Sequence, residues 1–320
     1  MDHYRGQPCL AQFPAPCLTP VCVRLEGMRL IRYRPAQPLD ALVECFWWSA
    51  REEPQPDPEH MLPSGGAQLI FALHDAPFTY WDRPPLASPL VWSRGIVHGP
   101  QSSYYLSGSK PAGAAVGVSL RPGAAGVILG VPVTEVADRH VTIDDLWGSR
   151  GRALQERLRE AGQPAMMFRI LEQELAARVT RPLLIHPAVG HALARAGSMG
   201  PRIRVSDVQR EAGYSPRHFI QLFRSAVGLT PNQFYRMKRF TTVLHALAQA
   251  QESNKGPDMA DLAALAGYSD QSHLIREFKE FAGITPTQYR PRAADSLHHH
   301  SVRIPIAGSR PEGKKNPRRP

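Results

Sequence analysis

Short apolar runs separated by turn residues occupy the chain from residue 28 to about residue 120. Segments rich in proline or glycine, such as 53–58, 64–66 and 83–85, lie between these runs. Apolar runs of this length, bounded by turn residues, are typical of strands. The pattern predicts a small β-domain with hairpin-like connections, and its clearest strand candidates are Leu42–Trp48, Gln68–Leu73, Leu90–Trp92 and Ala114–Leu120.

Helical spacing replaces this pattern after residue 123. We expect helices over residues 123–129, 132–139, 150–161, 165–179 and 187–197. In the fourth segment apolar residues recur every three or four positions, at Met166, Ile170, Leu171, Leu175 and Val179. Such a stripe indicates a helix that faces a core, and a dimer seam would produce it equally well.

The region from residue 205 to residue 289 contains an internal repeat. Residues 205–234 and 259–289 align with a shift of 54 residues, which becomes 55 after one extra residue in the second copy. Both copies contain Ala-Gly-Tyr-Ser near their centre and Gly-x-Thr-Pro near their end. The repeat indicates two equivalent folding units.

The shared positions predict helix boundaries. A glycine ends the first helix, because glycine accepts the left-handed backbone of a helix C-terminus, and a serine caps the second helix. Another glycine ends the second helix, and Thr-Pro begins a third. Two helices joined by a short glycine turn form a helix-turn-helix, and two copies in register are far more specific than one. The boundary residues are Gly213, Ser215, Gly228, Thr230 and Pro231, matched by Gly267, Ser269, Gly283, Thr285 and Pro286.

The second helix of each copy is expected to enter the major groove of DNA, which is wide enough to admit an α-helix. Apolar residues such as Phe219 and Phe278 form its inward face, and polar residues form the opposite face. Arg pairs with guanine and Gln with adenine, although a solvated polar face would have the same composition. The candidates for reading bases are Arg217, Gln221, Gln271, Ser272 and Arg276.

Other matched residues near these faces leave two interpretations open. Ile220 and Ile275 would contact thymine methyl groups or cover the edge of the core, and His218 and His273 would pack or face phosphates rather than bind a metal.

A continuous helix is predicted between the two copies, from residue 232 to about residue 251. Twenty helical residues span roughly 30 Å. Successive major-groove turns are about 34 Å apart, so this helix would hold two reading helices at a suitable spacing. Basic residues near the start of this helix and near the ends of the reading helices are candidates for phosphate contacts: Arg224, Arg236, Lys238, Arg239 and Lys279.

The distribution of charge also separates the region of the repeat from the rest of the chain. Residues 1–200 contain 19 Lys and Arg against 18 Asp and Glu, whereas residues 201–292 contain 13 against 8 and residues 293–320 contain 6 against 2. Almost all of the net charge of +10 therefore lies in the last 120 residues. A basic half beside a neutral half indicates a polyanionic partner, and a merely solvated basic surface would have the same charge.

Several classes of site and segment are not expected. The four cysteines, Cys9, Cys17, Cys22 and Cys45, form no CxxC pair, so we expect no metal, redox site or cofactor. Residues 1–27 lack the apolar segment of a signal peptide, and no stretch is long and apolar enough to span a bilayer. We expect a cytoplasmic protein with no membrane partner.

Both ends of the chain are expected to be disordered. The first is the leader 1–27, after which Met28 is a candidate start. The second is the basic tail 293–320, whose three histidines at residues 298–300 are expected to be solvated.

The paired units, the linking helix and the closing segment Gly283–Tyr289 resemble the AraC/XylS family of bacterial regulators over about residues 200–292. The resemblance implies one polypeptide that reads two adjacent groove segments of double-stranded DNA, often as an activator that contacts RNA polymerase. Ile220 departs from the polar residue that many members have at its position.

Segments 116–125, 129–139 and 146–148 are similar to the sensor domain of one AraC subgroup. This similarity implies a cupin-like β-domain followed by helices, with a small-molecule effector. Aromatic residues of this part are candidates for lining its pocket or filling its core: Trp47, Trp48, Tyr80, Trp81 and Trp92.

The expected fold is therefore α+β, with a sensor and dimerisation-like domain over residues 28–182 and a double helix-turn-helix domain over residues 183–292. The expected function is sequence-specific transcription regulation by a protein that is not an enzyme, with a homodimer as a candidate state. One alternative is a DNA-repair or other enzyme with an attached DNA reader. Alkyl-transfer repair needs an activated cysteine, and Cys45 lies in an apolar run without a basic neighbour. Another alternative is a nucleoid-type architectural protein.

Overall fold

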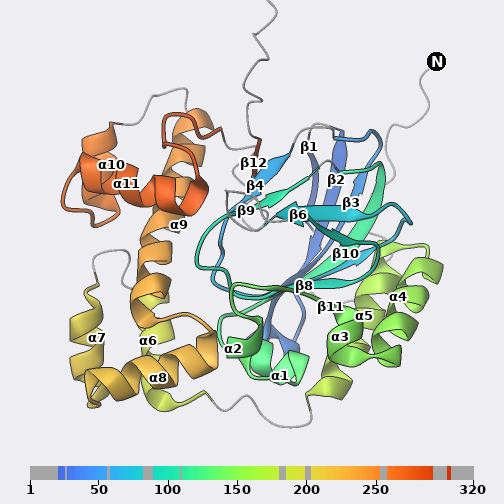
Figure 1. Cartoon of the computed structure of the whole chain (residues 1–320), viewed down its shortest axis with the longest axis horizontal. Helices are drawn as coiled ribbons and strands as arrows, with labels where there is room; N and C mark the ends of the chain where they lie inside the picture. Colours follow the sequence, from blue (N-terminus) through green and yellow to red (C-terminus); the bar gives the residue numbers. More distant parts are fainter. Residues whose placement is uncertain are drawn as a thin grey trace, which may run out of the picture.

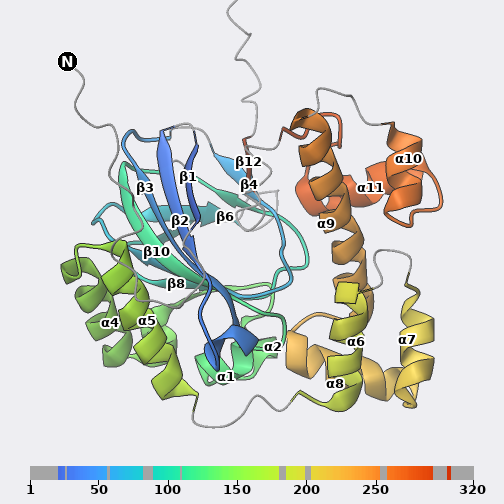
Figure 2. The same cartoon turned by 180° about the vertical axis from the view of Figure 1, so that it is seen from behind.

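The computed structural model describes residues 21–25, 27–55, 58–81, 89–108, 110–179, 185–198, 203–252, 258–290 and 301–303. Figures 1 and 2 show a β-rich part with helices on its outer side, and a helical part that lies against the opposite side. The chain passes from the first part to the second between α5 and α6, close to the expected boundary. The mixed α+β architecture agrees with the sequence prediction.

Two antiparallel sheets form the β-rich part. The seven-stranded sheet has the order β1-β2-β3-β10-β5-β8-β11, and the five-stranded sheet has the order β12-β4-β9-β6-β7. The strand bounds are β1 Val21–Leu25, β2 Met28–Tyr33, β3 Val43–Arg51, β4 Glu59–Met61, β5 Gln68–Ala72, β6 Phe78–Trp81, β7 Leu90–Trp92, β8 Ile96–His98, β9 Tyr105–Ser107, β10 Gly113–Leu120, β11 His140–Thr142 and β12 Ser301–Arg303. The four strand candidates of the sequence all correspond to strands.

Two strands lie in segments that we expected to be disordered. β1 pairs with β2 along its whole length, from Val21 opposite Arg32 to Leu25 opposite Met28. β12 pairs with β4, which places residues 301–303 at the edge of the second sheet. Backbone pairing with a sheet edge can order a segment that has little apolar content of its own. The histidines at 298–300, like Cys9 and Cys17, lie outside the described residues.

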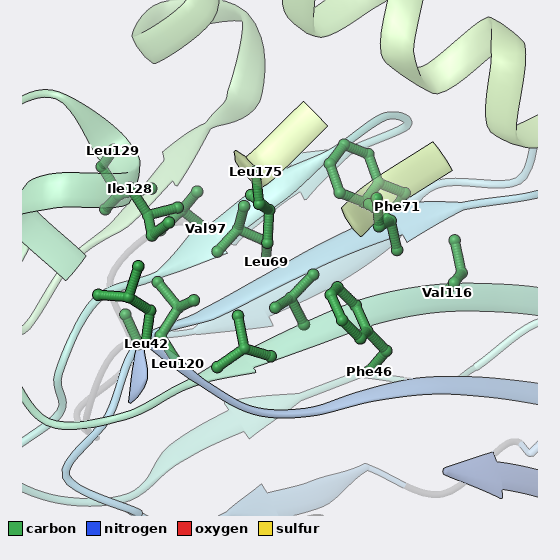
Figure 3. Close-up of a cluster of buried hydrophobic side chains, with 14 of the residues drawn as sticks. Leu42, Phe46, Leu69, Phe71, Val97, Val116, Leu120, Ile128, Leu129 and Leu175 are labelled. Atoms are coloured by element: carbon green, nitrogen blue, oxygen red, sulfur yellow. The ribbon is translucent and has the colours of Figure 1, made fainter. Parts of the chain in front are cut away.

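Side chains alternate between two cores. On β5, Leu69 and Phe71 face a core between the seven-stranded sheet and the helices, whereas Ile70 and Ala72 face a second core between the sheets. This alternation follows from the two-residue period of a strand. Figure 3 shows the first core, with Phe46, Phe71 and Leu175 of the covering helix among its labelled side chains.

Five helices follow β10, with β11 between the second and the third: α1 Ala125–Leu129, α2 Val133–Val136, α3 Ile143–Trp147, α4 Ser149–Glu160 and α5 Pro164–Arg178. A short 3-10 helix, Leu39–Ala41, lies between β2 and β3. On α5, Leu171 and Leu175 are fully buried in the first core, whereas Met166 is exposed. Leu171 and Leu175 of the apolar stripe therefore belong to the core, whereas Met166 does not.

The helical part contains α6 Pro187–Ser198, α7 Val205–Ala212, α8 Pro216–Val227, α9 Pro231–Glu252, α10 Met259–Leu265 and α11 Gln271–Ala282. The two predicted units are α7–α8 and α10–α11, and the predicted linking helix is α9. Gly213, Gly228, Gly267 and Gly283 all have positive φ, as the predicted helix ends require.

Two boundary predictions for the second copy are wrong. Asp270, not Ser269, caps α11, because the extra residue of this copy places the Asp270 carboxylate 2.7 Å from the backbone nitrogen of His273. In addition, residues 286–288 form a turn rather than a third helix. Pro291 follows closely in the sequence and disfavours helical backbone in the residue before it.

Candidate nucleic-acid interface and internal cavity

Each unit presents an apolar inner face and a polar outer face on its second helix. In α8, Phe219 and Phe223 are fully buried, and in α11, Leu274 and Phe278 are buried in the same core. This division follows from helical periodicity in both copies. The five candidates for reading bases, namely Arg217, Gln221, Gln271, Ser272 and Arg276, are all exposed.

These exposed residues lie in the first half of their helices. Ser215 accepts a hydrogen bond from the backbone of His218 and so fixes the start of α8, as Asp270 fixes the start of α11. Reading helices of helix-turn-helix proteins contact bases with their N-terminal residues. The arrangement thus leaves the base-reading halves of both helices accessible.

The four matched residues next to the reading faces differ between the copies. Ile220 is 38% exposed, whereas Ile275 packs partly against the helical core. His218 lies beside Tyr214, and His273 meets Tyr268 edge to face, with ring centroids 5.2 Å apart in both pairs.

The five phosphate candidates fall into two groups. Arg224 and Lys279 are exposed at the far ends of the reading helices. Arg236 and Arg239 instead lie between α9 and α11, where Nε of Arg236 is 2.7 Å from Oε2 of Glu277 and Nη2 of Arg239 is 3.2 Å from it. These two guanidinium groups are engaged within the protein.

Glu277 was not identified from the sequence, although a signal was present. It is 3% exposed and lies three residues after Leu274 and one before Phe278, on the inward stripe of α11. An acid on an inward stripe requires cationic partners. Lys238 also lies apart from a DNA-facing surface: burial lowers its pKa, the carboxylate of Glu44 on β3 opposes this, and its ammonium lies over the ring of Phe234.

Both reading helices end against the β-rich part. A Cβ on Gly228, after α8, would lie 3.2 Å from side-chain carbons of Val133, at the start of α2, and of Ala137, just after its end. A Cβ on Gly283, after α11, would lie only 2.6 Å from ring carbons of His60 and Tyr104. The views of Figures 1 and 2 agree that α8 lies beside α2.

Strand β4 makes the second of these contacts. His60 is buried, its ring stacks on Tyr104 at 4.5 Å, and its Nδ1–H donates to the carbonyl oxygen of Ala282 at 2.5 Å. Leu62, just beyond β4, is part of the helical core. No local sequence signal predicts this contact, because the partners are more than 200 residues apart.

An internal cavity of about 110 Å³ lies between the two sheets. Trp47 and Tyr80 line it, as the sequence analysis proposed, whereas Trp48, Trp81 and Trp92 do not. Trp48 lies on the opposite face of β3 and packs against the first core. Gly117 on β10 provides the space for Trp47, because a Cβ there would lie 2.3 Å from the indole ring.

The same strand β4 borders this cavity. Met61 lines it, as does Lys110, whose ammonium group lies 2.5 Å from the fully buried carboxylate of Glu59. Successive side chains of a strand point to opposite faces. Glu59 and Met61 thus face the cavity side, and His60 between them faces α11.

The described residues contain no group of three or more His, Cys, Asp or Glu side chains that is arranged to hold a metal ion. None of their helices combines the length and the apolar character needed to cross a membrane. Cys45 is buried, and burial raises its pKa to about 11.

Comparison with known proteins gave two family matches. Residues 208–292 match the family described as Helix-turn-helix domain, and residues 31–142 match the family described as Domain of unknown function (DUF6597). A crystal structure of apo ToxT from Vibrio cholerae is similar with a TM-score of 0.44 and 10% identity, covering 79% of this chain and 97% of that chain. This likeness is too weak to support a conclusion about function.

Curated relatives match the helical part. The chain is 30% identical over 88 residues to the probable transcription factor PqrA of Proteus vulgaris, covering 28% of this chain and 68% of that protein. It is 27% identical over 94 residues to the HTH-type transcriptional activator AarP of Providencia stuartii, covering 29% and 66%. The match to the probable transcriptional regulator LumQ of Photobacterium leiognathi covers only 34% of that protein. The relatives matched are transcription regulators, and the match at 30% identity over two thirds of PqrA, within the helix-turn-helix region, shows that the chain belongs to the AraC/XylS family of transcriptional regulators.

Proposed function

We propose that the protein is a sequence-specific, DNA-binding regulator of transcription whose β-rich part responds to a small-molecule effector, and that it is not an enzyme. The observation that carries this proposal is the repeated exposed polar face on α8 and α11. Arg217 and Gln221 on the first helix lie at the same distances from the helix start as Ser272 and Arg276 on the second, and all four are polar and exposed. Such residues suit direct contact with base edges.

The proposed DNA contacts divide into two kinds. The five base-reading candidates would give sequence selectivity, whereas the exposed Arg224 and Lys279 would neutralise phosphates and add affinity without sequence information. Arg236 and Arg239 would support the interface indirectly, because their ion pairs with Glu277 hold α11 against α9.

Effector control is supported by strand β4, which contacts both the cavity and the end of α11. A molecule in the cavity that displaced Met61, or Lys110 with its partner Glu59, would move β4. His60, which lies between Glu59 and Met61 on this strand, is hydrogen-bonded to the carbonyl oxygen of Ala282. A ligand shifts a conformational equilibrium only through contacts that differ between the two states. Bound at a promoter in the cytoplasm, the protein would then act through RNA polymerase.

The alternative of alkyl-transfer repair has little support from Cys45. Thiolate is the reactive form of cysteine, and the raised pKa of Cys45 keeps this thiol protonated at neutral pH.

Selection of bound fragments from random duplex DNA at near-physiological salt tests the proposal. We expect a bipartite motif whose halves are separated by about one helical turn, roughly 34 Å. Affinity for the selected site should fall steeply as salt rises. Equal binding to unrelated sequences would contradict the proposal and would favour an architectural protein.

A further inference from the structure

The cavity between the sheets contains a buried hydrogen-bonding group without a partner. His98 on β8 is 3% exposed and lines the cavity. Its Nδ1 lies 2.5 Å from Nδ1 of His140 on β11. Its Nε2 is buried and has no hydrogen-bond partner among the described residues. His140, unlike His98, does not line the cavity.

The two imidazoles determine which group can complete this site. One of the two Nδ1 atoms must carry the proton that they share. If His98 carries it, Nε2 of His98 is an acceptor; if His140 carries it, Nε2 of His98 is a donor. A hydroxyl group is both donor and acceptor, so it can pair with His98 in either tautomer.

Four aromatic side chains in the lining favour an aromatic group. Beside His98 the cavity is lined by the side chains of Trp47, Phe78, Tyr80 and Tyr105. Its volume is about 110 Å³. Apolar cavities of roughly 150 Å³ bind benzene, so the space is on the scale of one six-membered ring.

The charges around the cavity argue against an ionised ligand. Its lining, as far as the structure describes it, includes no acidic side chain to pair with a cation. Of its basic side chains, Lys110 is already paired with Glu59, and the guanidinium group of Arg51 donates to the sulfur of Met28 at 3.6 Å. Burial, together with the neighbouring His140 and Lys110, keeps the pKa of His98 well below its ordinary value. His98 is thus neutral at physiological pH and offers a hydrogen bond rather than a charge.

We propose that this cavity binds an uncharged, single-ring aromatic alcohol of the phenol class, with its ring between Trp47 and Tyr80 and its hydroxyl group on Nε2 of His98. This inference names the effector class of the proposed function and rests on it for the link to DNA binding. The binding itself is a property of the β-rich part.

Calorimetric titration of the full chain with phenol, toluene and benzoate tests the inference. Phenol should bind at least about tenfold more tightly than toluene, because only phenol satisfies the buried Nε2. Benzoate should bind more weakly than phenol. Equal affinity for phenol and toluene would overturn the role of His98, and tighter binding of benzoate would identify an anion site instead.

Variants separate recognition from folding. His98→Phe keeps an aromatic ring and should reduce the preference for phenol over toluene to about onefold, while His98→Gln restores a donor and acceptor and should recover part of it. Trp47→Ala should abolish binding of phenol, whereas its neighbour Trp48→Ala, on the other face of β3, should leave the affinity unchanged. Circular dichroism and thermal unfolding show whether each variant is folded. Unchanged phenol selectivity in folded His98→Phe would contradict the assignment.

DNA binding without ligand distinguishes the two proposals. If the folded chain selects a bipartite DNA motif but does not bind phenol, the ligand class is wrong and the regulator remains. If it binds phenol but shows no sequence preference on DNA, the proposed function is wrong and the cavity assignment remains.

Discussion

The two reading helices end at equivalent glycines, and both ends rest on the β-rich part, but in different ways. Gly228 contacts the apolar side chains of Val133 and Ala137, whereas Gly283 contacts the rings of His60 and Tyr104. The first contact is non-directional. The second includes a buried hydrogen bond to Ala282, and it belongs to the strand that borders the cavity. Two units with the same sequence pattern can therefore be coupled to the β-rich part differently. The second unit, through its hydrogen bond to β4, is better placed to respond to a change in the cavity.

The interiors of the two units also differ, because the second unit contains a buried polar contact where the first has an apolar one. Glu277 of α11 corresponds in the alignment to Leu222 of α8. Leu222 packs against the helical core, whereas Glu277 is buried with Arg236 and Arg239. Buried ion pairs fix geometry strictly, because an unpaired charge in the interior is costly. The position of α11 on α9 thus depends on a charged network that α8 lacks.

The largest effect is expected for Glu277→Ala. Removing this carboxylate takes away the ion-pair partner of Arg239 and leaves Arg236 with only the exposed Glu280, which should lower the free energy of unfolding by about 3–5 kcal/mol. Chemical denaturation of the full chain measures the loss. Glu280→Ala, at the exposed end of the same network, is the control and should cost less than about 1 kcal/mol. Similar losses for both variants would contradict a special role for the buried carboxylate.

A smaller effect separates the two glycine contacts. Gly228→Ala and Gly283→Ala both place a Cβ on left-handed backbone, which costs about 1–2 kcal/mol. Gly283→Ala must also displace His60 or Tyr104, so we expect it to be the more destabilising variant in thermal unfolding. It should also change the affinity for DNA more than Gly228→Ala does. The opposite order would place the stricter contact at the first unit.

The smallest effect is a dependence on pH. Burial lowers the pKa of His60 below its unfolded value of 6.5, so between these two values the unfolded chain binds more protons than the folded chain. The free energy of unfolding should therefore fall as the pH drops below about 6.5. His74, His98 and His245 shift in the same direction and contribute to the total.

His60→Phe isolates the part of this dependence that comes from the second contact. The phenyl ring can still stack on Tyr104, but it cannot be protonated, so stability measured by denaturation between pH 7.5 and 5.5 should fall less steeply than in the wild type. An equally steep fall would show that His60 does not contribute.

The helical part was largely predictable because its signals are local. Gly213, Gly228 and Ser215 each specify a boundary through their own backbone or side chain, and the apolar stripe of α8 is visible within twelve residues. The exposure of the five base-reading candidates was predictable for the same reason, since exposure on a helix follows from its period.

The remaining features depend on contacts between distant segments. The sequence predicts Arg236 as a phosphate contact, because its ion-pair partner Glu277 lies 41 residues later and leaves no local signal. The approach of His60 to Ala282 joins residues 222 positions apart. Trp47 and Trp48 are adjacent residues of the same type, and only the pairing of β3 with β10 decides which of them faces the cavity. Strand register and contacts between distant segments cannot be predicted from a local sequence pattern.

We propose that α8 and α11 read two neighbouring segments of one DNA duplex. DNA selection with Arg217→Ala and with Arg276→Ala, compared with the wild type, tests it most directly. Each variant should bind the preferred site more weakly by about 1–3 kcal/mol and lose preference at a different half of the motif. The two relaxed positions should lie about one helical turn apart. Relaxation at the same position, or a uniform loss on all sequences, would contradict the account.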